Sequence, residues 1–300
     1  TIEYLKSRDT ANPFCLFLSW GPPHHPYRLA PQKYLDMYDP DAIQGRPNCP
    51  DVPREDLWGY YAQTTFLDDQ FQRLLNVLDE LEITNNTIVV FSSDHGDMHG
   101  SHGLYKKQWP WNEAIKIPFV IRYPGRVAGG QEIGAPINVI DIMPTLLGLT
   151  GLPVPDAVEG VDLSAYITGV RDDPPESVLI MNPCPFSIGD TRGYDQYPDY
   201  KGERLEYRGV ITERYTYVRT IDRPWLLYDN VKDPYQLDNL IDDPECKDIR
   251  IHLETVMRGH MAAISDKLMP REYYYDQFNI VFDHRGKVID LVENMYDRKG

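Results

Sequence analysis

From Asp56 to Glu82, apolar side chains recur at steps of three and four residues. This spacing gathers leucine and aromatic side chains on one face, and it predicts one long amphipathic helix packed on a sheet. Other runs are apolar almost throughout, which is typical of short strands covered on both faces; they lie at 14–20, 88–91 and 117–121. A shorter helix is predicted at 138–149. These elements predict an α/β layer with helices covering a mostly parallel or mixed central sheet.

The pattern changes beyond the proline-containing stretch at 151–160. Two runs separated by a short turn, at 207–212 and 215–219, predict an antiparallel hairpin. Further strands are predicted at 178–181 and 225–229, and a helix at 249–268. We therefore expect two domains. The first, residues 1–165, is part of an α/β domain, and the second, residues 166–300, is a smaller α+β subdomain with an antiparallel sheet and a tail.

The composition excludes several classes of protein. The net charge of −16 argues against nucleic-acid binding, because contacts with phosphates need a basic surface. It also argues against binding to an anionic membrane surface. No stretch approaches the ~18 consecutive apolar residues of a membrane-spanning helix. The four cysteines are widely scattered and lack the spacing of a zinc site.

Candidate chemistry follows the strand predicted at 88–91. Asp94 and His95 stand directly beyond this strand, and ligands of open α/β sheets bind beyond the carboxyl ends of strands. A carboxylate beside an imidazole suits a hard or borderline cation. Lys107, twelve residues after His95, supplies a positive charge for an anionic substrate group. The alternative reading is an ordinary turn with solvated polar side chains. A second candidate is His24, which lies with His25 in a proline-stiffened loop after the run at 14–20.

The chain resembles the sulfatases of the alkaline-phosphatase-like superfamily. The resemblance covers about residues 14 to 245 and rests on four segments in the family's order. They are Pro23-His24-His25-Pro26-Tyr27, Ser93-Asp94-His95-Gly96-Asp97 with Gly100-Ser101-His102-Gly103-Leu104, Lys107, and Leu227-Tyr228-Asp229 with Asp233-Pro234 and Asn239-Leu240. The resemblance implies an alkaline-phosphatase-like α/β sandwich and hydrolysis of sulfuric esters assisted by one calcium ion.

The resemblance also implies a role for each matched residue. Asp94 and His95 match a pair of calcium ligands. Lys107 matches the lysine that touches the sulfate group and its bridging oxygen, which makes it both catalytic and substrate-binding. His24 matches a histidine that contacts the sulfate or assists the leaving group, so it has the same two roles. His102 is expected to shape the substrate pocket.

One part of the family pattern is absent from these 300 residues. The nucleophile of sulfatases is a formylglycine made in a Cys/Ser-x-Pro/Ala-x-Arg motif, and this sequence contains no such motif. The aspartate pair that completes the metal site is also absent. We therefore expect a carboxyl-terminal portion of a sulfatase, with an incomplete metal site, an incomplete large sheet and little or no turnover by itself. We hypothesise that copies associate through the surface that the incomplete sheet exposes.

Two alternatives stay open. A phosphodiesterase or phosphonate monoester hydrolase of the same superfamily shares the Asp-His-Gly turn and the lysine, and a non-catalytic protein could bind sulfated glycans in the same pocket. The expected partner is a sulfated small molecule or a sulfated glycan. Trp109, Arg192 and Arg204 are candidates for a sugar-binding rim. The sequence does not decide among a periplasmic, secreted or cytoplasmic location.

Overall fold

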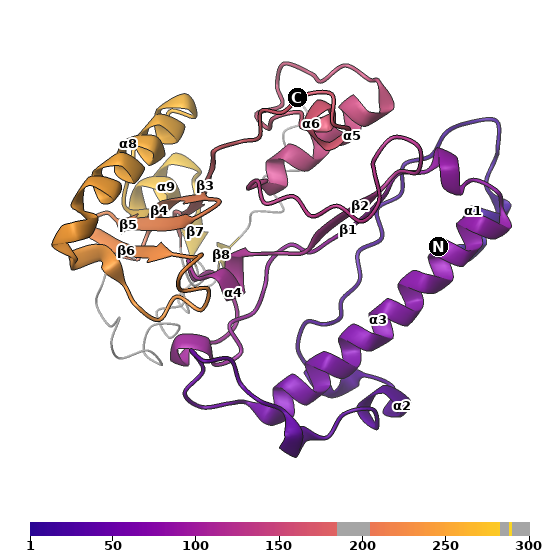
Figure 1. Cartoon of the computed structure of the whole chain (residues 1–300), viewed down its shortest axis with the longest axis horizontal. Coiled ribbons are helices and arrows are strands. Elements are labelled where there is room, and N and C mark those ends of the chain that lie inside the picture. Colours follow the sequence, from indigo (N-terminus) through magenta and orange to yellow (C-terminus); the bar gives the residue numbers. More distant parts are fainter. Residues whose placement is uncertain (185–204, 283–287, 290–300) are drawn as a thin grey trace. The chain divides into compact units, whose positions relative to one another are not determined.

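The computed structural model describes residues 1–184, 205–282 and 288–289 (Figure 1). Contacts within the chain define two compact units. The first contains residues 1–106 and 117–131, and the second contains residues 107–116 and 132–300. Each unit is described by itself below. The division into domains at residue 165 stays a prediction. Within the described residues, no helix has both the length and the apolar content needed to cross a bilayer.

The first unit is built around α3 (Arg54–Glu80), which confirms the predicted long helix (Figure 1). Its buried face includes Leu67, Val77 and Leu78. The last two pack with Leu5 of α1 (Ile2–Ser7), while Ala62 packs with α2 (Gln32–Leu35). Short 3₁₀ turns connect these elements, at Tyr27–Leu29, Pro40–Ala42, Thr84–Asn86 and Ser101–Gly103.

Two strands of the first unit pair with each other. β1 (Val89–Ser92) and β2 (Phe119–Arg122) are antiparallel, with Val89 opposite Arg122 and Ser92 opposite Phe119. The strands expected at 88–91 and 117–121 are therefore confirmed. Their arrangement differs from the buried parallel strand expected at 88–91, because every described residue of β1 is half-buried and the partner that the described residues provide runs antiparallel.

The strand expected at 14–20 is not formed. This run has no regular secondary structure, and Phe17 is 86% exposed. Its apolar pattern matched a covered strand, but a strand also needs a neighbour that takes up its backbone N–H and C=O groups. The described residues provide no such neighbour to this run. Association of copies through exposed apolar surface stays a hypothesis.

The second unit contains the antiparallel sheet expected from the sequence. Its strand order is β3-β4-β5-β6, and each neighbouring pair is antiparallel. The strands are Ser177–Asn182, Tyr207–Thr212, Tyr215–Thr220 and Pro224–Asp229. β4 and β5 form the predicted hairpin.

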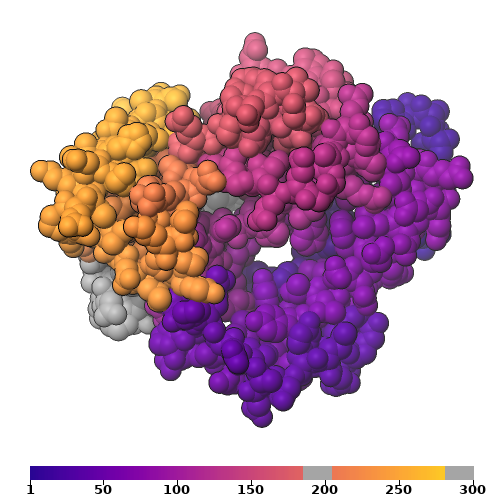
Figure 2. Space-filling model, viewed as in Figure 1, coloured from indigo at the N-terminus to yellow at the C-terminus, as the bar shows by residue number. Residues whose placement is uncertain are grey.

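One face of this sheet packs against α8 (Lys247–Ala263), which confirms the predicted helix. The core between them contains Val210, Tyr217 and Leu227 of the sheet with Leu253 and Met257 of the helix. The outer side of α8 forms part of the surface in Figure 2. This core fixes which sheet face is free to meet other segments, because strand side chains alternate between the two faces.

Smaller elements complete the second unit. The helix predicted at 138–149 is present as a 3₁₀ turn (Val139–Asp141) followed by α5 (Ile142–Thr150). Asn138 and Asp141 form a capping box at its start. The remaining elements are α4 (Asn112–Ile115), α6 (Ser164–Ile167), α9 (Arg271–Gln277), the strand pair Val281–Phe282 and Val288–Ile289, and 3₁₀ turns at Leu240–Asp242 and Pro244–Cys246.

Candidate active site

Three of the predicted site residues lie together in the first unit. Asp94 and His95 directly follow β1, and the ring of His24 lies edge-on to the ring of His95 with 6.5 Å between ring centroids. The Asp94 side chain is 85% exposed and that of His95 is 29% exposed. The fold thus brings a carboxylate and two imidazoles from two separate loops to the same end of β1.

Hydrogen bonds fix which nitrogen of His95 is available. Its Nδ1 lies 2.7 Å from the carbonyl oxygen of Gly96. Because a carbonyl oxygen only accepts, Nδ1 carries the hydrogen, and Nε2 bears a lone pair when the ring is neutral. This Nε2 lies 3.4 Å from Oδ2 of Asp94. A lone pair and a carboxylate oxygen at this separation can both face one cation.

The donor set fits part of a divalent metal site. Carboxylate oxygen and neutral imidazole are both metal ligands, and the Gly96 carbonyl orients the His95 ring in the manner of an outer-shell partner. Among the residues that the structure describes, no group of three or more His, Cys, Asp or Glu side chains could hold a metal. Asp94 and His95 are two candidate ligands, and the described residues do not supply a complete set.

The His24 loop rests on α3. Gln63, which is 2% exposed, donates through Nε2 to the carbonyl oxygens of Pro26 (2.9 Å) and Tyr27 (2.5 Å). A Cβ at Gly59 would lie 2.6 Å from the Tyr27 carbonyl, so this helix position must lack a side chain for the loop to approach. These contacts set the height of the loop above the helix and hence the place of His24.

His24 is itself oriented by its neighbour. Its Nδ1 donates to the carbonyl oxygen of His25 over 2.8 Å, and the two rings stack with centroids 4.1 Å apart. With Nδ1 holding a hydrogen, Nε2 is the nitrogen whose protonation state can change. His24 is an exposed residue.

Asp97 connects the two loops of the site, and sequence reasoning assigned it no role. Its Oδ2 accepts a hydrogen bond of 2.6 Å from the Tyr27 hydroxyl. Its Oδ1 accepts from the backbone N–H groups of His99 (3.2 Å) and Lys106 (3.1 Å). Burial raises the pKa of the Tyr27 phenol, and the hydrogen bond to Asp97 and its negative charge raise it further. Tyr27 is therefore a neutral donor to Asp97.

His102 is held in the turn after β1. Its backbone adopts a left-handed conformation (φ 54°), its N–H donates to the Asn48 carbonyl (2.7 Å), and its Nε2 accepts from Nδ2 of Asn48 (3.1 Å). Nearby Gly100 has φ 85°, and a Cβ there would lie 3.0 Å from Sγ of Cys49. The segment 31–54, which carries Asn48, thus packs on the turn. The sequence did not predict the side-chain amide of Asn48 as a partner of the site.

His99 lies in the first unit, next to Tyr27 of the His24 loop. Its ring packs on Tyr27 and Tyr60, with centroids 4.9 and 4.5 Å away, and its Nε2 is buried without a hydrogen-bond partner. Burial lowers the pKa of His99 below its usual value, so the ring is neutral at pH 7. Its role is packing.

Lys107 belongs to the second unit, whereas the other four predicted site residues belong to the first. Its side chain is half-buried. Both of its neighbours have left-handed backbones, with φ 63° at Lys106 and φ 80° at Gln108. Such conformations are costly for residues other than glycine and need support from surrounding contacts.

The prediction of Trp109 as a rim residue is wrong. Its side chain is buried, with 1% exposed, and it cannot meet a sugar in solution. An aromatic residue in a polar stretch of sequence can lie at the surface or in a small core. The tertiary contacts of Trp109 place it in a core. The other two rim candidates, Arg192 and Arg204, lie outside the described residues.

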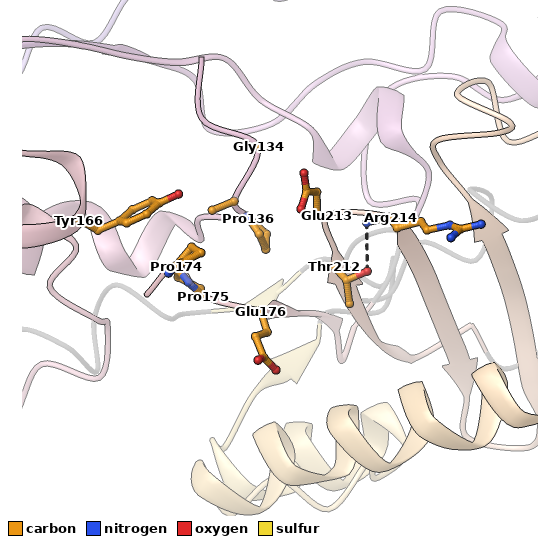
Figure 3. Close-up of a pocket in the computed structure, with 10 residues that line it drawn as sticks. Gly134, Pro136, Tyr166, Pro174, Pro175, Glu176, Thr212, Glu213 and Arg214 are labelled. Carbon is orange, nitrogen blue, oxygen red and sulfur yellow. Dashed lines mark hydrogen bonds between the residues drawn. The ribbon is translucent and has the colours of Figure 1, made fainter. Parts of the chain in front are cut away.

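A cavity of about 400 Å³ occurs in the second unit, and it is separate from the residues considered so far (Figure 3). Its walls include Tyr166, Pro174 and Pro175, together with the carboxylates of Glu176 and Glu213. Thr212, also in the wall, accepts a hydrogen bond of 3.2 Å from the backbone N–H of Arg214. The charged lining residues are Glu176, Glu213 and Arg214, and no predicted site residue lines this cavity.

Comparison with known proteins places the chain in a family. Residues 1–152 match the model of the Sulfatase family. The chain is 40% identical over 295 residues to the ulvan-active sulfatase of Formosa agariphila, an alignment that covers 96% of this chain and 55% of the relative. This chain belongs to the sulfatase family, with its alkaline-phosphatase-like fold. Sulfatases generally use a divalent metal ion.

Solved structures support the same fold. A Bacteroides thetaiotaomicron protein solved in work on the metabolism of multiple glycosaminoglycans superimposes with a TM-score of 0.77 at 30% identity, covering 93% of this chain and 60% of that one. The phosphonate monoester hydrolase of Agrobacterium radiobacter gives a TM-score of 0.72 at 22% identity, covering 96% and 62%; this likeness shows the fold alone. The chain spans about half the length of the curated relatives that it matches.

Proposed function

We propose that the protein represented by this chain hydrolyses sulfate esters of a glycan with the help of a calcium ion. The proposal rests on the arrangement at the end of β1, where Nε2 of His95 lies 3.4 Å from Oδ2 of Asp94 and the ring of His24 lies edge-on to that of His95. Membership of the sulfatase family supports the type of reaction. The roles of the individual residues are part of the proposal.

Asp94 and His95 would hold the metal. Calcium prefers oxygen ligands, and Asp94 supplies them while His95 contributes its Nε2. When bound, a divalent cation neutralises charge on the non-bridging oxygens of a sulfate group. The remaining ligands, like the formylglycine nucleophile of the family, do not come from a recognisable motif in these 300 residues.

His24 and Lys107 would act on the ester oxygen. Cleavage of a sulfate ester leaves negative charge on the departing alcohol oxygen, and a donor at that oxygen lowers the barrier. His24 has Nδ1 committed to the His25 carbonyl, so Nε2 is the atom that would hold the proton for the alcohol. Lys107 would contribute a positive charge to the sulfate and bridging oxygens, and His102 would shape the pocket wall.

A sulfated glycan is the proposed substrate class rather than a sulfated small molecule. The relatives support this choice through their names, an ulvan-active sulfatase and an endo-4-O-sulfatase that is 32% identical over 297 residues. The second candidate function is hydrolysis of phosphonate monoesters or phosphate diesters; the phosphonate monoester hydrolase of Agrobacterium radiobacter shares the fold.

A side-by-side assay tests these functions. The protein purified from its source would be given a sulfated glycan, an aryl sulfate and an aryl phosphate diester, and the release of sulfate or phenol would be measured. Turnover of both sulfate esters at rates well above that of the diester supports the proposal. Faster turnover of the diester would replace it with the second candidate. Binding of the sulfated glycan without any hydrolysis would instead indicate a non-catalytic glycan-binding protein.

A further inference from the structure

The segment that begins at Lys107 lies on one face of the four-stranded sheet. Residues 107–116 belong to the second unit by their contacts. Val210, Tyr217 and Leu227 point to α8, so alternation along the strands places Tyr207, Thr216 and Tyr228 on the opposite face. This opposite face is the one that receives the segment.

Hydrogen bonds attach the segment to the sheet and to the turn that follows β6. Nδ2 of Asn182, the last residue of β3, donates to the carbonyl oxygen of Gln108 over 3.2 Å. Nε1 of Trp111 donates to the Tyr228 hydroxyl over 3.3 Å. The backbone N–H of Asn112 donates to Oε1 of the buried Gln236 over 2.9 Å.

Aromatic rings fix the middle of the segment. Trp225 of β6 lies at a register shift between β5 and β6, where the alternation of side chains is interrupted. The ring of Trp111 lies edge-on to that of Trp225, 5.4 Å between centroids, and tilted against that of Trp109 at 6.0 Å. Trp225 also lies 6.4 Å from Tyr207 of β4. All four rings are buried. Packed rings of this size make a rigid anchor, so the segment has little freedom beyond Gln108.

The backbone around Lys107 needs support on both sides. The left-handed Lys106 has its N–H bonded to Asp97 and its carbonyl bonded to the N–H of Met98 (2.8 Å). The left-handed Gln108 has its carbonyl bonded to Asn182. A strained residue holds its conformation only where surrounding contacts determine it. The bonds of Lys106 therefore support the backbone before Lys107, and the bond to Gln108 supports the backbone after it.

We propose that Asn182 is a positioning residue for Lys107, through its hydrogen bond to the Gln108 carbonyl. This inference rests on the proposed function, in which Lys107 acts on the sulfate and bridging oxygens. Asn182 also accepts a hydrogen bond of 3.2 Å from the backbone N–H of Cys184 through Oδ1, so its amide is held in the plane that the bond to Gln108 requires. Through this bond the smaller antiparallel sheet would position the proposed catalytic lysine.

The first experiment measures the surroundings of Lys107 and needs no turnover. The protein would be acetylated briefly with limiting acetic anhydride, and peptide mass spectrometry would compare labelling of Lys107 with that of the exposed Lys106 as an internal standard. In Asn182→Ala the Lys107 to Lys106 ratio should rise about threefold or more, because the half-buried amine gains freedom when its backbone is released. An unchanged ratio in a folded variant would overturn the proposal.

The second experiment measures activity. Asn182→Ala should lower kcat for a sulfate ester with a poor leaving group about tenfold, with KM changed less than about twofold, since a misplaced ammonium loses most in the transition state. Asn182→Asp keeps the shape and the acceptor for Cys184 but sets a carboxylate against the Gln108 carbonyl, so it should lower kcat at least as much. In a Lys107→Ala background, neither variant should lower kcat further.

Ser177→Ala provides the matched control. Ser177 lies at the other end of β3 and makes one side-chain hydrogen bond of 2.8 Å, to Nε2 of His260 on α8. Loss of the bond between Ser177 and His260 should lower thermal stability about as much as loss of the Asn182 bond. It should leave kcat and the Lys107 to Lys106 labelling ratio unchanged. Equal losses of kcat in Ser177→Ala and Asn182→Ala would show that Asn182 has only a general structural role. The same conclusion would follow if the losses from Asn182→Ala and Lys107→Ala were additive. A wild-type protein without sulfatase activity would defeat the proposed function, while the labelling ratio would still decide the role of Asn182.

Discussion

The Tyr27 hydroxyl donates a hydrogen bond of 2.6 Å to Asp97, and this bond joins the loop that carries His24 to the turn that carries Asp94 and His95. The two loops are about seventy residues apart in the sequence. Neither residue is one of the proposed ligands or proton donors. Their hydrogen bond nevertheless holds the loop of His24 at a set distance from the turn of Asp94 and His95.

Removing this bond should loosen the site. Tyr27→Phe is expected to lower the free energy of unfolding by about 1.5 kcal/mol, because it leaves an ionised acceptor with one hydrogen bond fewer. Urea titration monitored by fluorescence measures the loss. Tyr61→Phe, which changes a partly exposed tyrosine on α3, should cost less than about 0.5 kcal/mol. In Asp97→Asn, the further loss from Tyr27→Phe should shrink, and full additivity would contradict the link.

Two glycines in helices should respond with opposite signs to the same substitution. A Cβ at Gly59 of α3 would meet the Tyr27 backbone carbonyl at 2.6 Å, whereas a Cβ at Gly259 of α8 would meet nothing within 4 Å. Gly59→Ala should therefore destabilise the protein by about 1–3 kcal/mol and displace the His24 loop. Gly259→Ala should stabilise it by about 0.5–1 kcal/mol through helix propensity. Thermal unfolding of both variants tests this, and equal shifts would refute the close approach of loop and helix.

Stability should depend on pH through His99. Burial holds the pKa of His99 below its ordinary value of 6.5, so the unfolded chain takes up a proton at a higher pH than the folded chain does. This contribution to stability is complete above pH 6.5 and declines as the pH falls below that value toward the folded pKa.

Urea unfolding at pH 7.5 and pH 5.5 measures the effect as a difference between proteins. His99→Asn suits the left-handed backbone at this position (φ 44°) and removes the titrating ring. The drop in stability between the two pH values should be smaller in the variant than in the wild type. The same drop in both would show that His99 titrates normally.

Removal of the metal should abolish activity in a way that depends on Asp94. Chelation by EDTA should stop sulfate release, and added calcium should restore it. Asp94→Asn should need at least about tenfold more calcium for half-maximal recovery, because it replaces a charged ligand by a neutral one. Asp156→Asn, an exposed carboxylate outside the site, should recover like the wild type. Full recovery of Asp94→Asn at the wild-type calcium concentration would remove Asp94 from the metal site.

Local patterns were sufficient to predict much of the secondary structure. Helices α3 and α8 and the β4–β5 hairpin could be predicted from the sequence alone. The spacing of apolar residues indicates the type of each element and the face that it buries. Asp94 and His95 followed from the chemistry at the end of one predicted strand, and His24 from a proline-stiffened loop after the run at 14–20. In the structure, Asp94, His95 and His24 do lie together there, while their roles stay predictions.

Relations between distant segments required the tertiary structure. The run at 14–20 has the composition of a strand, but strand formation depends on a partner that its own residues do not specify. The ring of Trp109 packs on Trp111, which in turn packs on Trp225, more than a hundred residues further along the chain. The supporting bonds of Asp97, Gln63 and Asn182 likewise join segments far apart in the chain. A sequence displays chemical groups and local periods, whereas the distances between groups arise only when the chain packs, and those distances decide which polar residues support the site.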